Sequence, residues 1–461
     1  MTGISAWGAY IPALRLERSL LGKAWGTPAL PGARTVRAGD EDSLTMGVEA
    51  ALTCLGDRAR DDIDAVFFAT TTPPYAEKHA AATIAAVLGL RDAMTSDVTG
   101  SLRAGAAALR GALDAVDAGT ARTALVVAAD NRPAEPATAM EQLFGDGAAA
   151  VLVTKEAAVE IVSRASNAED FTGPWRRPGD SYVKTFDPKL ETEYGYIRPV
   201  GAAAKKALGE RTADAIVGYA PDPRTLAQLS KKLGIEARDA LFKTAGNLGA
   251  AHALVALAAA LDDASVGDRL LLVAQGEGAD AFVLEVRASV TSALPVRDQL
   301  AAGAPVPTYE SYLRSRRLLP SDAAEPKSST ITYWRDRAQA LPLIGVRCGN
   351  CGTVQFPANR ACYECSVFDQ MAPVSLQRTG TIFTFTLDHL LGGEYLETPL
   401  PRVVVDLDGG GRIFLEMTEV DPSSVAIGDR IEMTFRLLHD GAGFHNYYWK
   451  ARPPRRAPVR V

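Results

Sequence analysis

An internal repeat is the feature that most constrains how this chain folds. Three pairs of similar segments carry the repeat: IDAVFFATTTP (63–73) with ADAIVGYAPDP (213–223), TGSLRAGAAALRGALDAVDAG (99–119) with AGNLGAAHALVALAAALDDASVG (245–267), and GDGAAAVLV (145–153) with GADAFVLEV (278–286). The repeat spans roughly 150 residues, which is longer than the unit of a solenoid. It predicts two α/β halves packed around a pseudo-twofold axis, with a cleft where the halves meet.

Each half has the same predicted order of elements: strand, helix, strand, turn, buried helix, strand, glycine turn and strand. The strands are short, continuous apolar runs, as is typical of strands covered on both faces. The helices that begin near residues 102 and 250 are alanine-rich on nearly every side, so we expect them between two layers. Residues 157–210 have no counterpart in the first half, and they are interpreted as an insertion that caps the cleft, forms an interface or decorates the surface.

The segment SDVTGSLRAG (96–105) predicts a sharp junction between a strand and a helix. Enzymes often place a nucleophile at such a junction, because the helix N-terminus offers free N–H groups and partial positive charge. Here Leu102 stands at the junction, and leucine cannot act as a nucleophile. The adjacent Ser101 would need a base, so its default role is to cap the helix. In the repeat, Ser101 matches Asn247 and Leu102 matches Leu248, so the two junctions are expected to face each other.

Two further residues have reactive side chains and an ordinary structural interpretation. Cys54 lies on an apparent amphipathic helix, where a core thiol is the favoured interpretation. His252 lies one helical turn after Asn247, and it is interpreted as either a buried core histidine or a catalytic one.

Four of the five cysteines form two Cys-x-x-Cys pairs separated by ten residues, within CGNCGTVQFPANRACYEC. The predicted metal ligands are Cys348, Cys351, Cys362 and Cys365. Four thiolates at this spacing match the tetrahedral coordination of zinc, and four protein ligands leave no open position for catalysis. The sequence therefore predicts a structural zinc site in a zinc ribbon.

The sequence changes character after residue 286, and its second part is rich in strands. The segment DGGG (408–411) is a hairpin signature, and about five strands in this part are expected to form a small OB-type barrel. The chain is predicted to have four parts: a layered α/β domain over 1–286, a linker and helix over 287–340, a zinc ribbon over 341–370 and an OB fold over 371–461. Within the first part, the two halves are at 1–156 and 211–286, and the insertion is at 157–210.

Composition excludes several classes of partner. A net charge of −6 gives no electrostatic reason to bind nucleic acid or an anionic membrane, and the OB part lacks a basic, aromatic stripe. The longest apolar run, at 250–261, is too short to span a bilayer. The N-terminal MTGISAWGAYIPALRL lacks the features of a signal peptide, so we expect a cytoplasmic protein.

Two sets of segments carry a family resemblance. In the first part they are GDEDSLTMGVEAA (39–51), TTPPYAEKHAAATIAAVLGL (71–90), SLRAGAAAL (101–109), GDGAAAVLV (145–153) and GNLGAAHALVAL (246–257). This part resembles the thiolase superfamily, and most of all the archaeal and bacterial 3-hydroxy-3-methylglutaryl-CoA (HMG-CoA) synthases. From about residue 305, YLRSRRLLP, the cysteine segment and GTIFTFT resemble the zinc-ribbon and OB-fold proteins that accompany acyl-CoA enzymes. The resemblance implies a two-half layered αβαβα fold and a CoA thioester as substrate.

The resemblance also implies chemistry that this sequence retains only in part. The family uses a cysteine nucleophile, a glutamate acid/base, and a histidine and an asparagine that polarise the substrates. These four positions fall on Leu102, Thr71, Tyr219 and Asn247, so only the asparagine is kept. The candidate catalytic residues are therefore Asn247, Tyr219 and Ser101.

Three functions remain open at this point. The first is a subunit without acyl transfer that binds acyl-CoA and acts with a thiolase-type partner through the zinc-ribbon and OB parts. The second is a non-covalent aldolase or retro-aldolase on a CoA thioester, with Tyr219 as acid/base. The third is an HMG-CoA synthase-type acyltransferase, which needs a nucleophile near residue 102. We expect a homodimer within a larger complex, as the resemblance implies.

Overall fold

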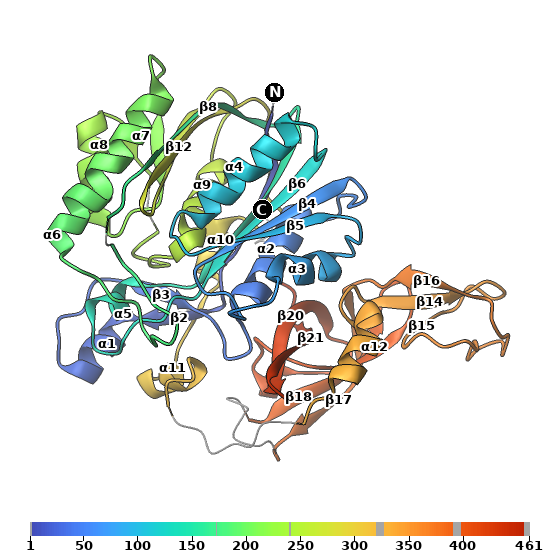
Figure 1. The fold of residues 1–461 in the computed structure, drawn as a ribbon. Coiled ribbons are helices and arrows are strands. Elements are labelled where there is room, and N and C mark those ends of the chain that lie inside the picture. Colours follow the sequence, from blue (N-terminus) through green and yellow to red (C-terminus); the bar gives the residue numbers. More distant parts are fainter. Residues whose placement is uncertain (1, 172, 239–240, 320–326, 391–397, 456–461) are drawn as a thin grey trace. The chain divides into compact units, whose positions relative to one another are not determined.

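A computed structural model describes residues 2–171, 173–238, 241–319, 327–390 and 398–455 (Figure 1). The chain forms two compact units, of which the first comprises Met1–Ala38, Asp42–Ala85 and Leu90–Tyr312 and the second comprises Gly39–Glu41, Ala86–Gly89 and Leu313–Val461.

The first unit is built on a ten-stranded mixed sheet. Its strands are β1 (Thr2–Tyr10), β4 (Ile63–Thr70), β5 (Met94–Thr99), β6 (Thr123–Asp130), β7 (Gly147–Lys155), β8 (Val159–Ala168), β9 (Ala215–Gly218), β10 (Glu236–Ala237), β11 (Arg269–Gln275) and β12 (Gly278–Val286). Their order in the sheet is β10-β9-β11-β12-β8-β1-β7-β6-β4-β5.

The sheet consists of two halves with the same topology, which confirms the predicted α/β fold class. The first half runs β5-β4-β6-β7-β1 and the second runs β10-β9-β11-β12-β8. In each half the first three strands are parallel and the last two are antiparallel additions. An antiparallel pairing of β1 with β8 joins the halves.

This topology corrects the interpretation of residues 157–210 as an insertion without a counterpart. Strand β8 occupies the position in the second half that β1 occupies in the first. Helix α7 (Arg198–Leu208) packs on β8, β11 and β12, as α2 (Ser43–Leu55) packs on β1, β6 and β7. The second half therefore begins at Val159, and between β8 and α7 there remains the segment 169–197, whose described residues add no strand to the sheet.

The helices form layers around the two half-sheets. Helix α4 (Ala104–Asp117) and helix α9 (His252–Asp262), which follows the short helix η2 (Gly249–Ala251), lie between the halves, while α2 and α7 lie on the outer faces (Figure 1). Alanine on most sides of α4 and α9 allows this close approach. A Cβ on Gly105 would lie 2.5 Å from the carbonyl oxygen of Ala250, so only glycine fits where the two central helices begin.

The first unit contains several smaller elements. A three-stranded sheet comprises β2 (Leu14–Glu17), β3 (Ala33–Val36) and β13 (Ala304–Pro305). The other helices are α1 (Arg18–Trp25), α5 (Ala139–Leu143), α6 (Pro188–Leu190), η1 (Glu191–Ile197), α8 (Pro223–Leu233) and α10 (Val296–Ala301). Helices α3 (Ala80–Leu88) and α11 (Tyr309–Ser315) begin in the first unit and end in the second.

The second unit contains two small sheets and one longer helix. Its elements are α12 (Thr330–Ala340), β14 (Ile344–Cys348), β15 (Val354–Gln355), β16 (Met371–Ser375), β17 (Thr379–Asp388), β18 (Leu400–Leu407), β19 (Arg412–Glu416), η3 (Pro422–Ser424), β20 (Arg430–Gly441) and β21 (Phe444–Arg452). Strands β14–β16 form the sheet that carries the cysteines. The order of the other sheet is β19-β18-β17-β20-β21.

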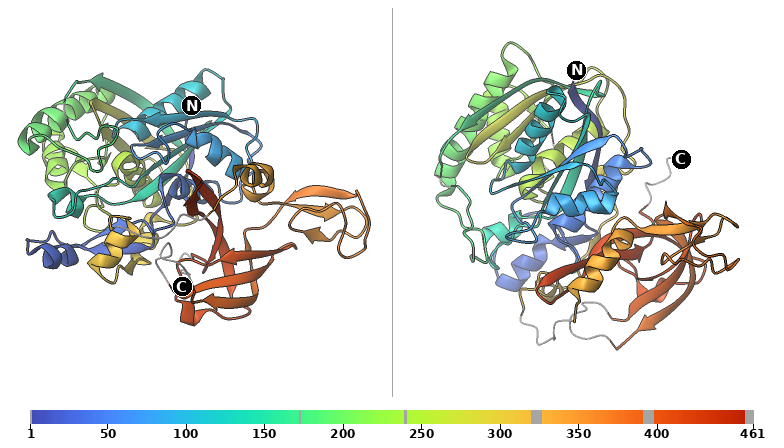
Figure 2. Two further views of the ribbon diagram at one scale, coloured as in Figure 1. Left: turned by 60° about the horizontal axis from the view of Figure 1, so that its bottom comes forward. Right: turned by 45° about the vertical axis from the view of Figure 1, so that its right-hand side comes forward.

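The five-stranded sheet curls into a barrel, which is visible as the orange to red strands in the left view of Figure 2. A bridge between Met417 and Ala451 connects the two edge strands. The predicted hairpin at 408–411 joins β18 to β19, and Gly409, Gly410 and Gly411 all have positive φ. These features confirm the expected small OB-type barrel.

Among the residues that the structure describes, no helix is both long enough and apolar enough to cross a membrane.

Candidate functional site

Asp130, at the end of β6, ties the two halves of the first unit together. Its side chain is buried and accepts five hydrogen bonds. The donors are Thr71 N (2.7 Å), Thr70 Oγ1 (3.0 Å) and Thr72 Oγ1 (2.9 Å) to Oδ1, and Thr71 Oγ1 (2.8 Å) and Ala250 N (2.7 Å) to Oδ2. Three consecutive threonines after β4 are thus linked to the start of η2. Thr71, at the position where the resemblance implies a glutamate, serves this linkage.

The structure brings two of the predicted catalytic residues together. Tyr219 follows β9 and Asn247 precedes η2, and both are buried. Asn247 Nδ2 donates a hydrogen bond to the Tyr219 hydroxyl at 3.3 Å. Asn247 Oδ1 accepts one from Gly249 N at 3.0 Å, so the amide is oriented with its NH₂ group toward the phenol. Backbone hydrogen bonds to Leu143 and Gly145 hold Asn247 in place.

The surroundings of Tyr219 keep its phenol protonated. Burial raises the pKa of Tyr219 above its ordinary value of 10, against the opposing effects of the Arg132 charge and the hydrogen bond from Asn247. Arg132 is itself buried, and its guanidinium lies 4.1 Å from the centre of the Phe144 ring. Since Asn247 is the donor to the phenol oxygen, the phenol keeps its own hydrogen and can donate it to a bound molecule.

His252 lies beside this pair, and its contacts favour the interpretation as a core histidine. Its Nδ1 accepts a hydrogen bond from Leu248 N at 3.2 Å. An accepting Nδ1 places the proton of the neutral ring on Nε2. The ring packs edge-on against Tyr219, with 5.9 Å between ring centres, and against Phe242 at 5.2 Å.

Ser101 contacts a carboxylate in the structure. Its hydroxyl donates to Glu277 Oε2 at 2.6 Å. Ser101 Oγ also accepts a hydrogen bond from Arg103 N at 3.4 Å, so Ser101 caps the turn that precedes α4, and α4 itself begins at Ala104 with Arg103 as its N-cap. The turn formed by Leu102 and Arg103 separates Ser101 from the helix. Leu102 itself is 8% exposed and belongs to the hydrophobic core of the first unit.

Cys54 is a buried thiol on α2, as the sequence predicted. Burial raises the pKa of Cys54 to about 12, so the reactive thiolate is absent near neutral pH. Cys54 therefore does not supply the nucleophile that Leu102 lacks.

Sequence reasoning missed three charged residues of this region: Asp130, Arg132 and Glu277. Asp130 ends the apolar strand TALVVAAD, and a lone carboxylate at the carboxyl end of a buried strand is a recognisable feature. Glu277 stands between Gly276 and Gly278 in the β11–β12 turn. Its contact with Ser101 joins residues 176 positions apart, which no local pattern reveals.

The four ribbon cysteines meet in the second unit. All four Sγ atoms lie within 4.8 Å of one another, with 3.6 Å between Cys348 and Cys365 and 3.6 Å between Cys351 and Cys362. Thiolates 2.3 Å from a tetrahedral zinc ion are about 3.8 Å apart, so this donor set fits zinc. A bound zinc ion would cross-link the two cysteine pairs and stabilise the fold of this small sheet.

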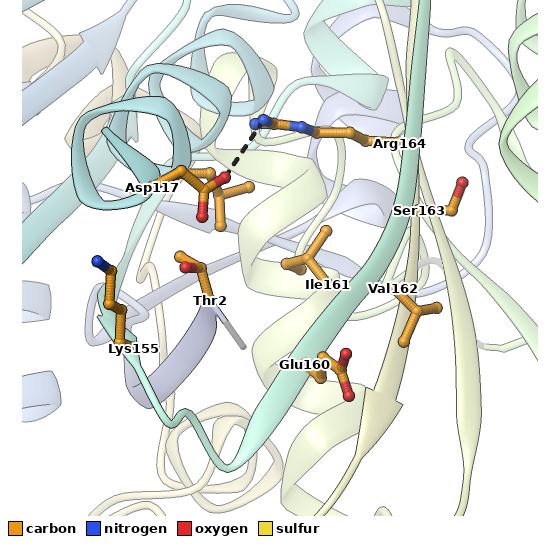
Figure 3. Close-up of a pocket in the computed structure, with 9 residues that line it drawn as sticks. Thr2, Asp117, Lys155, Glu160, Ile161, Val162, Ser163 and Arg164 are labelled. Carbon is orange, nitrogen blue, oxygen red and sulfur yellow. Dashed lines mark ion pairs between the residues drawn. The ribbon is translucent and has the colours of Figure 1, made fainter. Parts of the chain in front are cut away.

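A hollow of about 600 Å³ lies elsewhere on the first unit, between α4 and the strands β1, β7 and β8 (Figure 3). Its lining residues are Thr2, Leu113, Asp117, Lys155, Glu160, Ile161, Val162, Ser163 and Arg164. Arg164 reaches across it to Asp117, with 3.5 Å between the charged atoms. None of the predicted catalytic residues lines this hollow.

Known protein families match segments in both parts of the chain. The family described as 3-oxoacyl-[acyl-carrier-protein (ACP)] synthase III matches residues 96–169. The family described as ChsH2, rubredoxin-like zinc ribbon domain matches residues 335–369, and ChsH2, C-terminal OB-fold domain matches residues 373–436. The fold and the cysteine site thus define a thiolase-like protein joined to a zinc ribbon and an OB fold.

Comparison with individual relatives identifies the family within this class. The hydroxymethylglutaryl-CoA synthase of Aeropyrum pernix is 34% identical over 341 residues, which cover 68% of this chain and 90% of the relative. The chain therefore belongs to the hydroxymethylglutaryl-CoA synthase family. Two solved structures share its fold: MvaS in complex with 3-hydroxy-3-methylglutaryl coenzyme A (TM-score 0.60, 20% identity, 71% of this chain and 94% of that one), and an HMG-CoA synthase complexed with CoA (TM-score 0.59, 18% identity, 70% and 92%).

Proposed function

We propose that this chain is a subunit of a system that forms or cleaves a C–C bond in an acyl-CoA, and that it does so without an acyl-enzyme. The observation that carries the proposal is the residue at the β5–α4 junction. Leu102 is buried there, and the sequence contains no cysteine between Cys54 and Cys348. The fold of a covalent acyltransferase is thus kept without its nucleophile.

The family supports a CoA thioester as the substrate. The relatives are named for a reaction on hydroxymethylglutaryl-CoA, and the solved structures contain CoA compounds. We extend this substrate class to the present chain, with Tyr219 and Asn247 as the polar groups that meet the thioester. The length of the acyl chain is left open.

The zinc ribbon and the OB barrel support a thiolase-type partner through their resemblance to proteins that accompany acyl-CoA enzymes. We also propose a homodimer through β5, which is an edge strand of the ten-stranded sheet and carries an exposed Met94. An unpaired strand edge offers backbone groups to a second copy. Light scattering of the purified chain, alone and with the partner, measures both assemblies; a monomer in both samples would contradict the proposal.

A specific observation favours aldol chemistry on the thioester as the second candidate function. Tyr219 remains a neutral phenol and receives a hydrogen bond from Asn247. In cleavage of a 3-hydroxyacyl-CoA, a base removes the proton of the 3-hydroxyl group and the Cα–Cβ bond breaks. The electron pair moves to Cα as an enolate, and the Tyr219 phenol protonates Cα. Asn247 would stabilise the resulting phenolate until a proton returns to it.

Intact-protein mass spectrometry tests the absence of an acyl-enzyme. The chain is incubated with acetyl-CoA and with longer acyl-CoA thioesters, beside a thiolase that is known to acylate. We expect no adduct on this chain. An adduct would identify Ser101 or Cys54 as a nucleophile and would support an HMG-CoA synthase-type acyltransferase instead.

A pair of variants tests the role of Tyr219. Tyr219→Phe removes the phenol hydroxyl, and we expect it to lower turnover of 3-hydroxyacyl-CoA thioesters by about 100-fold or more. Tyr182→Phe changes a tyrosine outside the Tyr219–Asn247 pair and serves as the matched control. Full turnover in Tyr219→Phe would refute the aldol candidate, while the subunit proposal would still stand.

A further inference from the structure

Glu277 adopts a backbone conformation that residues with side chains rarely adopt. Its φ is +44°, in the turn between β11 and β12. Gly276 and Gly278 flank it, so the chain uses glycine at both neighbouring positions and keeps a glutamate in the left-handed one. A non-glycine residue with positive φ stores strain, and such residues cluster at functional sites.

The turn that carries Glu277 packs directly against the β5–α4 junction. A Cβ on Gly276 would lie 2.4 Å from Ser101 Oγ, 2.9 Å from Arg103 N and 3.1 Å from Leu102 N. This approach requires glycine at 276. It delivers the Glu277 carboxylate to Ser101, with 2.6 Å between the oxygens. The strained residue thus places a base beside the position where the family resemblance implies the nucleophile.

The Glu277 carboxylate differs from that of Asp130 in ways that matter for proton transfer. Asp130 is buried and surrounded by donors from Thr71 and its neighbours. Glu277 is exposed, and within the described part of the chain Ser101 is the one residue that donates to its carboxylate. The Asp130 carboxylate therefore stabilises the fold, while the Glu277 carboxylate has lone pairs available and is accessible to a substrate.

We propose that Ser101 and Glu277 form the proton-transfer pair for C–C bond chemistry on a 3-hydroxyacyl-CoA. The inference rests on the proposed function and supplies the base that the aldol candidate requires. Glu277 takes the hydroxyl proton of Ser101 while the Ser101 oxygen takes the proton of the substrate's 3-hydroxyl group. The Cα–Cβ bond then breaks, a carbonyl forms at Cβ, and the electron pair passes to Cα.

Tyr219 supplies the second proton that the reaction requires. Cα takes the phenol proton, so one proton has moved from the 3-hydroxyl group to Glu277 and another from Tyr219 to carbon. After the products leave, Glu277 releases its proton to water and the phenolate takes one from water. In the direction of bond formation the same groups act in reverse.

Glu277→Gln tests the pair directly, because glutamine has the same shape and still accepts a hydrogen bond from Ser101 but cannot act as a base. We expect kcat for 3-hydroxyacyl-CoA cleavage to fall about 100-fold or more, with KM changed less than about threefold. Glu169→Gln, which changes an exposed glutamate on a neighbouring segment, is the matched control.

Variants of Glu277 and Ser101 distinguish a catalytic role of the pair from a purely structural role in stabilising the turn. Glu277→Gly relieves the strain at positive φ, so its melting temperature should equal or exceed that of the wild type while its activity is lost. Ser101→Ala should lose activity, and Ser101→Thr, which keeps a hydroxyl, should retain a measurable part of it. A Glu277→Gln protein with wild-type kcat overturns the inference alone. A wild-type chain that cleaves none of these thioesters, alone or with a thiolase partner, overturns the proposed function and this inference with it.

Discussion

Replacement of Asp130 by asparagine should destabilise the first unit by several kcal/mol. The carboxylate accepts hydrogen bonds at both oxygens, and an amide can accept at only one. If the amide nitrogen takes the place of Oδ2, the hydrogen bonds from Thr71 Oγ1 and Ala250 N are lost. Each bond to a charged group contributes about 1.5–3 kcal/mol, so the loss is about 3–6 kcal/mol. A typical domain has a free energy of unfolding of about 5–15 kcal/mol, so this is a large share.

Hydrogen exchange of the full chain at increasing urea concentration measures this effect for each unit separately. Peptides from α4 and α9 should lose protection at lower urea in Asp130→Asn, while peptides from β20 and β21 in the second unit provide an internal reference. Asp263→Asn, which removes an exposed ion pair with Arg297, should cost less than about 1 kcal/mol. A loss below about 1 kcal/mol in Asp130→Asn would refute the argument that this carboxylate joins the two halves.

Three further predictions concern the cysteines and the acid stability of the second unit. Cys351→Ser should lose the one bound zinc ion per chain, as measured by elemental analysis; full zinc content in the variant would contradict the four-cysteine site. Cys54 should resist iodoacetamide at neutral pH in the folded chain and react after unfolding, because burial raises its pKa to about 12; rapid labelling of the folded chain would show an accessible thiol. A hydrogen bond from His445 is the main cause that lowers the pKa of Asp440 from 3.8 to about 2, so its stabilising effect is present above pH 4 and lost as the pH falls toward 2. In Asp440→Asn, the stability of β20 and β21 should therefore fall less steeply as the pH is lowered from 4 to 2. An unchanged acid transition would refute this assignment.

The repeat predicted the topology of the sheet because both halves keep the same buried strands. Strand β8 escaped notice because it is not an apolar run. Its sequence is VEIVSRASNA, and its charged residues are matched by distant partners: Glu160 by Arg287, and Arg164 by Asp114. Such pairing makes a charged strand tolerable in a central position of the sheet. A search for continuous apolar segments could not find it.

The candidate site was predictable only where the family resemblance pointed to individual residues. The resemblance pointed to Tyr219 and Asn247, and in the structure Asn247 Nδ2 lies 3.3 Å from the Tyr219 hydroxyl oxygen. The roles of Asp130 and Glu277 depend on contacts between residues 58 to 176 positions apart. Contacts of this kind are set by how the two halves pack, which local sequence patterns do not encode.

The residues that hold the two halves together differ from the residues that would carry out the reaction. Gly105 and Asp130 bring the two halves together, and neither depends on a nucleophile at the β5–α4 junction. The fold can therefore persist after Leu102 has taken the place of a reactive side chain, and membership of the family leaves the reaction open. What the family resemblance does not explain is a glutamate held at positive φ against Ser101. The contact of this carboxylate with Ser101 is the reason to assign proton transfer to this junction.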